Sequence, residues 1–369
     1  MRATAFLIGL AVCIPGLASA QTGSGPYNST YTITQLADGV HTLTWTTPPG
    51  SPAISNSTFI VGKDDVVLID TGLSRGAGEA ILEGLRRVTA KPVSTVINTH
   101  WHGDHIFGNQ VFRRAFPAAR FVAHAATRDG IITGEVDYRD VNRPKMEARL
   151  KELRAQAKRS EAEDRELSRA EMQIEVWQGD YVLPDVLIDQ KLTIMQGRRR
   201  IDVLHLGSAN TPGDVVIHLP ADRVVINGDM AITPIQFAFF SAPRAWIQTL
   251  DRLAALDAAM FVPGHGPVQR DARFIADLQA MLRSVVGQVD AGLKEGLDLE
   301  ALKTRVKVAP PAGSVYEKAT PAALDRLFRV PAIESAVKER ESAIKEPRIA
   351  VKEPRIAVKE PRIAVKEPR

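Results

Sequence analysis

The stretch Thr99-His100-Trp101-His102-Gly103-Asp104-His105 decides how this chain is interpreted, because it gathers three histidines and one aspartate within six residues. It directly follows residues 93–98, an apolar and β-branched run that predicts a buried strand. The cluster would then lie in the loop where that strand ends, a usual place for functional groups in α/β folds. Imidazole nitrogens and a carboxylate oxygen suit a divalent ion such as zinc. The sequence therefore predicts a metal site. The first two histidines can chelate one ion, and the aspartate and last histidine can reach a second.

Three other predicted strands end in a residue that could complete this site. The strand at 224–227 runs into Asp229, whose two carboxylate oxygens could bridge two cations. A second strand leads through a Pro-Gly turn to His265, and the glycines beside it allow backbone to approach a crowded centre. A third strand ends at Asp70, which could orient the histidine cluster without touching a metal. Asp229 and His265 taken singly could equally be turn residues, so only their combination with the cluster favours a site.

Taken together, these segments resemble the metallo-β-lactamase superfamily over roughly residues 30–270. The resemblance is carried by the motif His-x-His-x-Asp-His at 100–105 and by the order of Asp70, the stretch 211–214, Asp229 and His265. It implies an α+β fold, namely a four-layer αββα sandwich of the metallo-β-lactamase type with a two-metal site, usually zinc, at one edge. It also implies the ligands: His100, His102 and a third group in site one; Asp104, His105 and His265 in site two; and Asp229 bridging both.

One position departs from the pattern that the resemblance implies. The superfamily normally places a histidine just before the stretch at 211–214, and this chain has Asn210 there. An asparagine carbonyl can bind zinc, but it is a weaker and harder ligand than imidazole. We therefore expect site one to bind less tightly or to prefer another ion. His205, five residues upstream, could compensate only if its strand distorts, so we expect it to be structural.

The predicted function is hydrolysis of a small molecule by a metal-activated water, with two zinc ions as cofactor and no organic cofactor. A two-metal site lowers the pKa of bound water towards about 7, which provides a nucleophile for a carbonyl-type centre in a lactam, lactone or ester. Asp104 could orient that nucleophile and pass a proton. True β-lactamases of the superfamily often have Cys or Ser where this chain has Asp229, and the aspartate is more like that of thioesterases, lactonases and related hydrolases. Two alternatives stay open: a non-catalytic metal- or ligand-binding protein with a degraded site one, and an iron-dependent oxidoreductase.

The N-terminus predicts export. Residues 1–20 combine an early arginine, an apolar run and an Ala-Ser-Ala cleavage pattern, as in a secretory signal peptide, so we expect a periplasmic or secreted protein. The single cysteine, Cys13, lies in that segment, so no thiolate could bind the metal in the mature chain. No later segment has the length of a membrane span. Residues 21–344 are close to neutral, which argues against a nucleic-acid partner, and the sequence does not indicate the oligomeric state.

The remaining organisation follows from periodicity and composition. We expect a metallo-β-lactamase-like domain at 21–270 with a helical insertion at about 143–175, and a helical extension at 271–344. The charged insertion predicts one long helix or a helical pair, either as a solvated structural addition or as a lid that shapes substrate access. Residues 345–369 repeat a seven-residue unit with a proline in every copy, which predicts a disordered tail.

Residues 21–30 are rich in Gly, Ser and Asn and are predicted to be loose. Strands are predicted at 31–35, 40–45, 57–61, 66–69, 93–98, 120–123, 191–195, 201–206, 214–219, 223–227 and 260–262, and helices at 74–88 and 244–257 and within 271–344.

Overall fold

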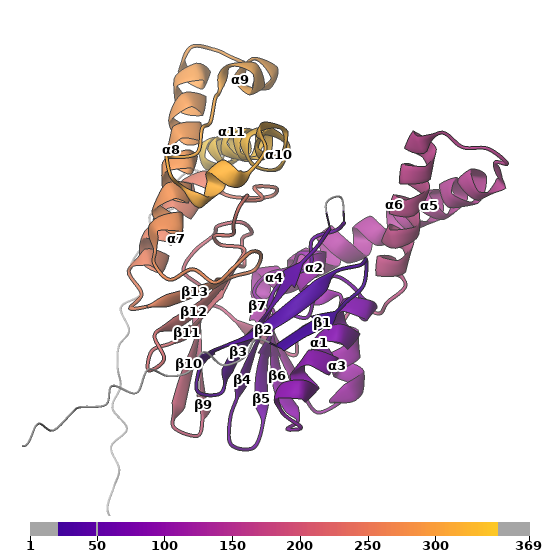
Figure 1. The fold of residues 1–369 in the computed structure, drawn as a ribbon. Coiled ribbons are helices and arrows are strands. Elements are labelled where there is room, and N and C mark those ends of the chain that lie inside the picture. Colours follow the sequence, from indigo (N-terminus) through magenta and orange to yellow (C-terminus); the bar gives the residue numbers. More distant parts are fainter. Residues whose placement is uncertain (1–20, 49–50, 346–369) are drawn as a thin grey trace, which may run out of the picture.

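Two β-sheets form the centre of the molecule (Figure 1). The computed structural model describes residues 21–48 and 51–345. The first sheet has eight strands in sequence order: β1 (Gln21–Ser24), β2 (Thr30–Ala37), β3 (Val40–Thr46), β4 (Ser57–Val61), β5 (Val66–Ile69), β6 (Val93–Ile97), β7 (Arg120–His124) and β8 (Val186–Ile188). The second sheet runs in the order β13 (Met260–Pro263), β12 (Val224–Gly228), β11 (Val216–Leu219), β10 (Arg199–Leu204) and β9 (Lys191–Gln196).

Strand direction brings the functional loops to one edge of the molecule. Strands β5, β6, β7 and β8 pair in parallel, whereas the strands before them pair antiparallel. In the second sheet only β12 and β13 are parallel. Parallel neighbours end at the same edge, so the segments that follow β5, β6, β12 and β13 can converge. These are the segments that carry Asp70, the histidine cluster, Asp229 and His265.

The layers follow from alternation along the strands. On β5, Val66 and Leu68 belong to the core on the outer side of the first sheet, whereas Val67 and Ile69 belong to the core between the two sheets. This is the two-residue period of a strand that is buried on both faces. A third core lies between the second sheet and the C-terminal helices. The predicted four-layer αββα sandwich is therefore confirmed.

Helices cover the outer face of each sheet. On the first sheet lie α1 (Arg75–Val88), which begins where the side chain of Ser74 accepts a hydrogen bond from the backbone N–H of Ala77, and α3 (Asn109–Ala115). On the second sheet lie α7 (Pro243–Ala254) and α8 (Arg273–Lys294). Residues 299–345 add α9 (Leu299–Arg305), a 3₁₀ turn (Val315–Lys318), α10 (Pro321–Leu324), a π-helical turn (Asp325–Arg329) and α11 (Val330–Lys345).

The insertion between β7 and β8 is a helical pair, one of the two forms that the sequence allowed. It consists of α4 (Ala125–Gly130), a π-helical turn (Ile131–Val136), α5 (Asp137–Ala155) and α6 (Glu161–Trp177). The helix does not continue from α5 into α6, because a capping box at Ser160 starts a new helix. Ser160 and Glu163 form reciprocal hydrogen bonds in this box. Figure 1 shows α5 and α6 extending away from the sheets.

The prediction of a loose segment at 21–30 is wrong for its first residues. β1 adds to the edge of the first sheet by pairing with β2, through backbone hydrogen bonds that require no apolar pattern. Gly23 is needed in this strand, because a Cβ there would lie 2.2 Å from the ring of Tyr31. The short strand β8 and the helical stretch at 125–136 were not predicted either.

The predicted signal peptide at 1–20 and nearly all of the repeat tail at 345–369 lie outside the described residues. Among the helices that are described, none combines the length and the apolar character needed to cross a lipid bilayer.

Candidate metal centre

The histidine cluster occupies the turn that leads from β6 into the short helix α2 (Gly103–Ile106). His102 is the N-cap of that helix, so the backbone reverses within the motif and turns neighbouring side chains towards one centre. From the other sheet, the loop after β13 approaches so closely that a Cβ on Gly264 would lie 2.1 Å from Oδ1 of Asp229. Only glycine permits this approach, which explains the Pro-Gly turn before His265.

Two groups of side chains form the centre. In the first group, His100, His102 and Asp229 each place a possible ligand atom within 4.8 Å of the others. The rings of the two histidines lie 4.6 Å apart, and Nε2 of His100 is 3.9 Å from Oδ2 of Asp229. This group matches the set that the resemblance implied for site one, apart from Asn210.

The second group contains Asp104, His105 and His265. Oδ2 of Asp104 lies 2.9 Å from Nε2 of His265 and 3.8 Å from Nε2 of His105. Asp229 also borders this group, with Oδ1 at 3.2 Å from His105 and Oδ2 at 3.7 Å from His265. Asp229 therefore lies between the two groups, where a carboxylate could serve both.

The arrangement fits divalent metal ions. Two ligands that each lie about 2.0–2.1 Å from a tetrahedral zinc are separated by about 3.3 Å, which is close to the separations found here. The ligand atoms are also buried without partners: Nε2 of His100, His105 and His265 and both carboxylate oxygens of Asp229 make no hydrogen bond among the described residues. Leaving buried polar atoms unpaired is costly, so a cluster of them aimed at one point indicates a site for bound ions.

The charges of the centre also favour cations. Burial and the neighbouring histidines hold the pKa of His100 well below its usual value, so its imidazole is neutral and can bind a metal. Burial alone would also lower the pKa of His105, but Asp229, Asp70 and Asp104 together raise it well above its usual value. The three carboxylates around His105 therefore favour a positive charge at this side of the centre.

Asp70 holds the second group in place from behind. Its Oδ2 accepts a hydrogen bond from Nδ1 of His105 at 2.7 Å, which leaves Nε2 of that ring facing the centre. The same carboxylate accepts bonds from the backbone N–H and the hydroxyl of Thr99, at 2.8 and 2.7 Å. Asp70 adopts a left-handed backbone conformation, with φ 55°, to reach this position. A carboxylate that fixes the tautomer of a ligand histidine is a usual feature of zinc sites.

Comparison with known proteins agrees with this geometry. The sequence profile of the Metallo-beta-lactamase superfamily matches residues 50–265, which is more than half of the chain. The chain belongs to the metallo-beta-lactamase superfamily. The matched range contains every residue of the two ligand groups.

Individual relatives of this superfamily member are distant. A linear primary-alkylsulfatase from Pseudomonas sp. is 23% identical over 266 residues, which cover 68% of this chain and 50% of the relative. The alpha subunit of a 2,4-dinitroanisole O-demethylase from Nocardioides sp. is 23% identical over 260 residues, covering 69% and 65%. Among solved structures, the stereoselective inverting sec-alkylsulfatase Pisa1 from Pseudomonas sp. has a TM-score of 0.56 and 17% identity over 85% of this chain and 52% of that one. The chain thus spans about half the length of the alkylsulfatases that it matches.

Asn210 lies in the segment between β10 and β11 and is fully buried. Neither its Oδ1 nor its Nδ2 makes a hydrogen bond among the described residues, as is also true of the ligand atoms. His205 is engaged elsewhere: its Nδ1 lies 3.0 Å from the backbone oxygen of Asp214, and its ring stacks on His124 at 4.1 Å. His205 therefore does not join either ligand group.

Sequence reasoning missed Glu135, which comes from the π-helical turn of the insertion. Its Oε1 accepts a hydrogen bond from the backbone N–H of Gly103 at 3.0 Å, so the insertion is attached to the metal loop. Burial and the nearby Asp104 raise the pKa of Glu135 to about 8. No local signal indicates this residue. The packing of the insertion on Trp101 does have a sequence signal. Gly130 and Gly134 are spaced one helical turn apart, and both pack against the ring of Trp101.

Proposed function

We propose that this chain is an exported, zinc-dependent hydrolase that binds two metal ions and hydrolyses a lactam, lactone or ester by attack of water on its carbonyl-type centre. The observation that carries the proposal is the convergence of six His and Asp side chains into two adjacent groups. Their buried ligand atoms include five, on four of these residues, that make no hydrogen bond among the described residues. A purely structural cluster would pair these atoms with one another or with backbone groups.

The chain's own residues suit hydrolysis. Zinc held by these groups would act as a Lewis acid and supply a water of lowered pKa. Asp104 differs from the other carboxylates of the centre in being partly exposed, and it lines the adjacent pocket. Its carboxylate is therefore placed to orient water and to accept a proton, while Asp229 remains buried between the two groups. Asp70 keeps His105 oriented throughout, because its three hydrogen bonds do not depend on substrate.

Sulfate esters are a second candidate substrate class. The matched alkylsulfatases act on such esters, as their names state, and the pocket beside the metal centre is lined mainly by apolar side chains. An alkyl sulfate and a carboxylic ester both offer an electrophilic centre next to an alkyl group. The two classes are compared by measuring kcat/KM for an alkyl sulfate and a carboxylic ester whose alkyl chains have equal length.

Export is proposed on the pattern of residues 1–20 alone. Expression of the full chain in a bacterial host, followed by separation of periplasm from cytoplasm, tests it. Protein that lacks residues 1–20 and is recovered from the periplasm would support export. Uncleaved protein confined to the cytoplasm would contradict it.

The decisive test is turnover on a panel of esters, lactones, lactams and alkyl sulfates. We expect hydrolysis of at least one class that stops with a chelator and returns when zinc is added. The variant His265→Ala should lose activity by at least about 1,000-fold, since it removes a ligand of the second group. His218→Ala is the matched control: this histidine is on β11, its Nε2 lies 3.4 Å from the backbone oxygen of Asp257, and it belongs to neither ligand group.

A zinc-loaded protein without turnover on any class would overturn the proposal. In that case a non-catalytic binding protein, which Asn210 in place of a histidine would favour, becomes the better account.

A further inference from the structure

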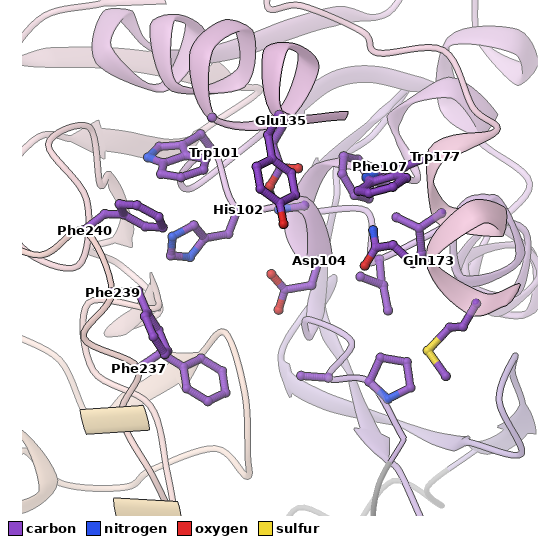
Figure 2. Close-up of a pocket in the computed structure, with 18 of the residues that line it drawn as sticks. Trp101, His102, Asp104, Phe107, Glu135, Gln173, Trp177, Phe237, Phe239 and Phe240 are labelled. Carbon is purple, nitrogen blue, oxygen red and sulfur yellow. The ribbon is translucent and has the colours of Figure 1, made fainter. Parts of the chain in front are cut away.

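A pocket of about 600 Å³ opens beside the metal centre, a volume typical of small-molecule sites. One wall comes from the insertion, with Trp177 and Val176 of α6. The opposite wall comes from the segment that carries Phe237, Phe239 and Phe240. Figure 2 shows the aromatic side chains arranged on both sides of the space, with Asp104 and His102 between them.

The carboxylates and the imidazole of this pocket are gathered near the metal loop, and the insertion wall adds only the neutral polar side chains of Gln173 and Tyr138. Asp104 and His102 belong to the metal centre, and Glu135 is bonded to the backbone of Gly103. Among the described residues that line the pocket, none is a lysine or an arginine. A negatively charged group on the distal part of a substrate would therefore lose water without gaining a cationic partner, which is strongly unfavourable.

Phe240 gives a second and independent indication of what the pocket binds. Its side chain is 68% exposed, although phenylalanine is normally buried, and its ring lies 5.4 Å from that of Trp101. Its backbone has a φ of 61°, a left-handed conformation that is rare for a bulky side chain. Such strain is typical of functional sites, and here it holds an apolar ring open to the pocket. An apolar ligand that covers Phe240 would remove this exposed surface from water.

We propose that the pocket binds an extended apolar group of the substrate that carries no negative charge at its far end. This inference rests on the hydrolase proposed above and specifies its substrate class. Esters, lactones or sulfate esters with an alkyl or aromatic group of several carbons fit the space. Substrates with a carboxylate remote from the cleaved bond do not fit it.

The test compares p-nitrophenyl decanoate with the p-nitrophenyl monoester of sebacic acid, which has the same number of carbons and adds a terminal carboxylate. We expect kcat/KM for the decanoate to exceed that for the charged ester by at least about 100-fold. Within the neutral series from butyrate upwards, we expect a rise of about fourfold for each added methylene until the pocket is filled. Equal rates for the two ten-carbon esters would overturn the proposal.

A variant pair makes the same test within the protein. Met172 lies on α6, lines the pocket and is partly exposed, so Met172→Lys adds a cation without cutting into a core. We expect Met172→Lys to lower the preference for the neutral ester by at least about tenfold, mainly by faster hydrolysis of the charged one. Met172→Leu keeps the wall apolar and should leave the preference unchanged. The same preference in both variants would contradict the proposal.

Binding separates this proposal from the proposed hydrolysis. Trp101 and Trp177 line the pocket, so ligands that enter it should change the tryptophan fluorescence of the zinc-loaded protein. We expect decanamide to bind at least about 100-fold more tightly than the monoamide of sebacic acid, whether or not any ester is hydrolysed. Equal binding of the two amides would overturn the pocket inference even in an active hydrolase. Selective binding without turnover would uphold it and count against the hydrolase.

Discussion

The metal centre and the helical insertion border the same pocket, but each is held together by different forces. At the metal centre, the polar groups are buried and tightly placed: His105 is fully buried and Asp70 bonds it at 2.7 Å. In the insertion, the main polar links between the two helices are exposed ion pairs such as Arg149 with Glu166 at 2.8 Å. Buried and directional contacts favour a single arrangement, whereas exposed ion pairs contribute little stability.

The unequal burial of these contacts indicates which wall of the pocket is rigid. The wall formed by the metal loop is continuous with two sheets and their shared core. The wall formed by α6 depends on a smaller cluster, in which Leu150 of α5 packs with Ile174 and Trp177 of α6. Trp101, Ile106 and Phe107 of the metal loop join this cluster at its edge. Local stability follows the density of buried contacts, so we expect the insertion to open more readily than the sheets. Substrate entry would then depend on the insertion, and chemistry on the metal loop.

Among the variants that compare the two regions, we expect Asp70→Ala to have the largest effect, because it removes buried hydrogen bonds at the metal centre. The variant removes the partner of His105 and the acceptor for Thr99, and it places alanine in a left-handed conformation. We expect zinc affinity to fall by about 10–100-fold, measured by competition with a chromophoric chelator. Asp70→Asn is the control: asparagine tolerates this backbone conformation and keeps one acceptor, so it should lose less. Unchanged affinity in Asp70→Ala would show that the buried network does not fix the ligands.

An intermediate effect is expected from a matched pair of core truncations. Leu153 of the insertion and Leu43 of β3 are both fully buried, so each change to alanine costs about 2–5 kcal/mol where its surroundings are cooperative. We expect Leu153→Ala to speed amide hydrogen exchange in α5 and α6 alone, and Leu43→Ala to lower the thermal midpoint of the whole domain. Mass spectrometry of exchanged peptides measures the first effect, and differential scanning calorimetry measures the second. If Leu153→Ala weakened the protection of both sheets equally, the two regions would form one cooperative unit.

The smallest effect is expected at the surface of the insertion. Arg149 pairs with Glu166 through two hydrogen bonds of 2.8 and 2.9 Å, yet both side chains are exposed. We expect Arg149→Ala to leave the unfolding midpoint and the exchange rates of α5 unchanged within measurement error. The neighbouring change Leu150→Ala, on the buried face, should accelerate exchange measurably. A large effect of Arg149→Ala would mean that ion pairs, rather than the small core, hold the helical pair together.

Features that depend on short sequence spacing could be predicted from the sequence. The ligands at 100–105 are contiguous, so their spacing alone placed them in one turn, and strand ends supplied Asp229, His265 and Asp70. The αββα fold followed from the resemblance and from alternating apolar runs. The sequence left open whether the insertion is one long helix or a pair, and the capping box of Ser160 and Glu163 decides for the pair.

Other features depend on contacts between segments that are distant in the sequence, so no local sequence pattern predicts them. Glu135 reaches the metal loop only because a π-helical turn packs on Trp101, and that packing depends on the whole insertion. β1 is an edge strand whose pairing uses backbone groups, so its Gly- and Ser-rich sequence resembled a loop. The apolar pocket likewise combines side chains from distant segments, which no spacing rule brings together.

The two-metal centre is tested by the zinc content of the purified, zinc-equilibrated protein, determined by elemental mass spectrometry. The two ligand groups with Asp229 between them predict two zinc ions per chain, falling to one or fewer in His265→Ala. A protein that retains no zinc after equilibration, or that binds the same amount when His265 is replaced, would contradict the assignment of these residues as a two-metal centre.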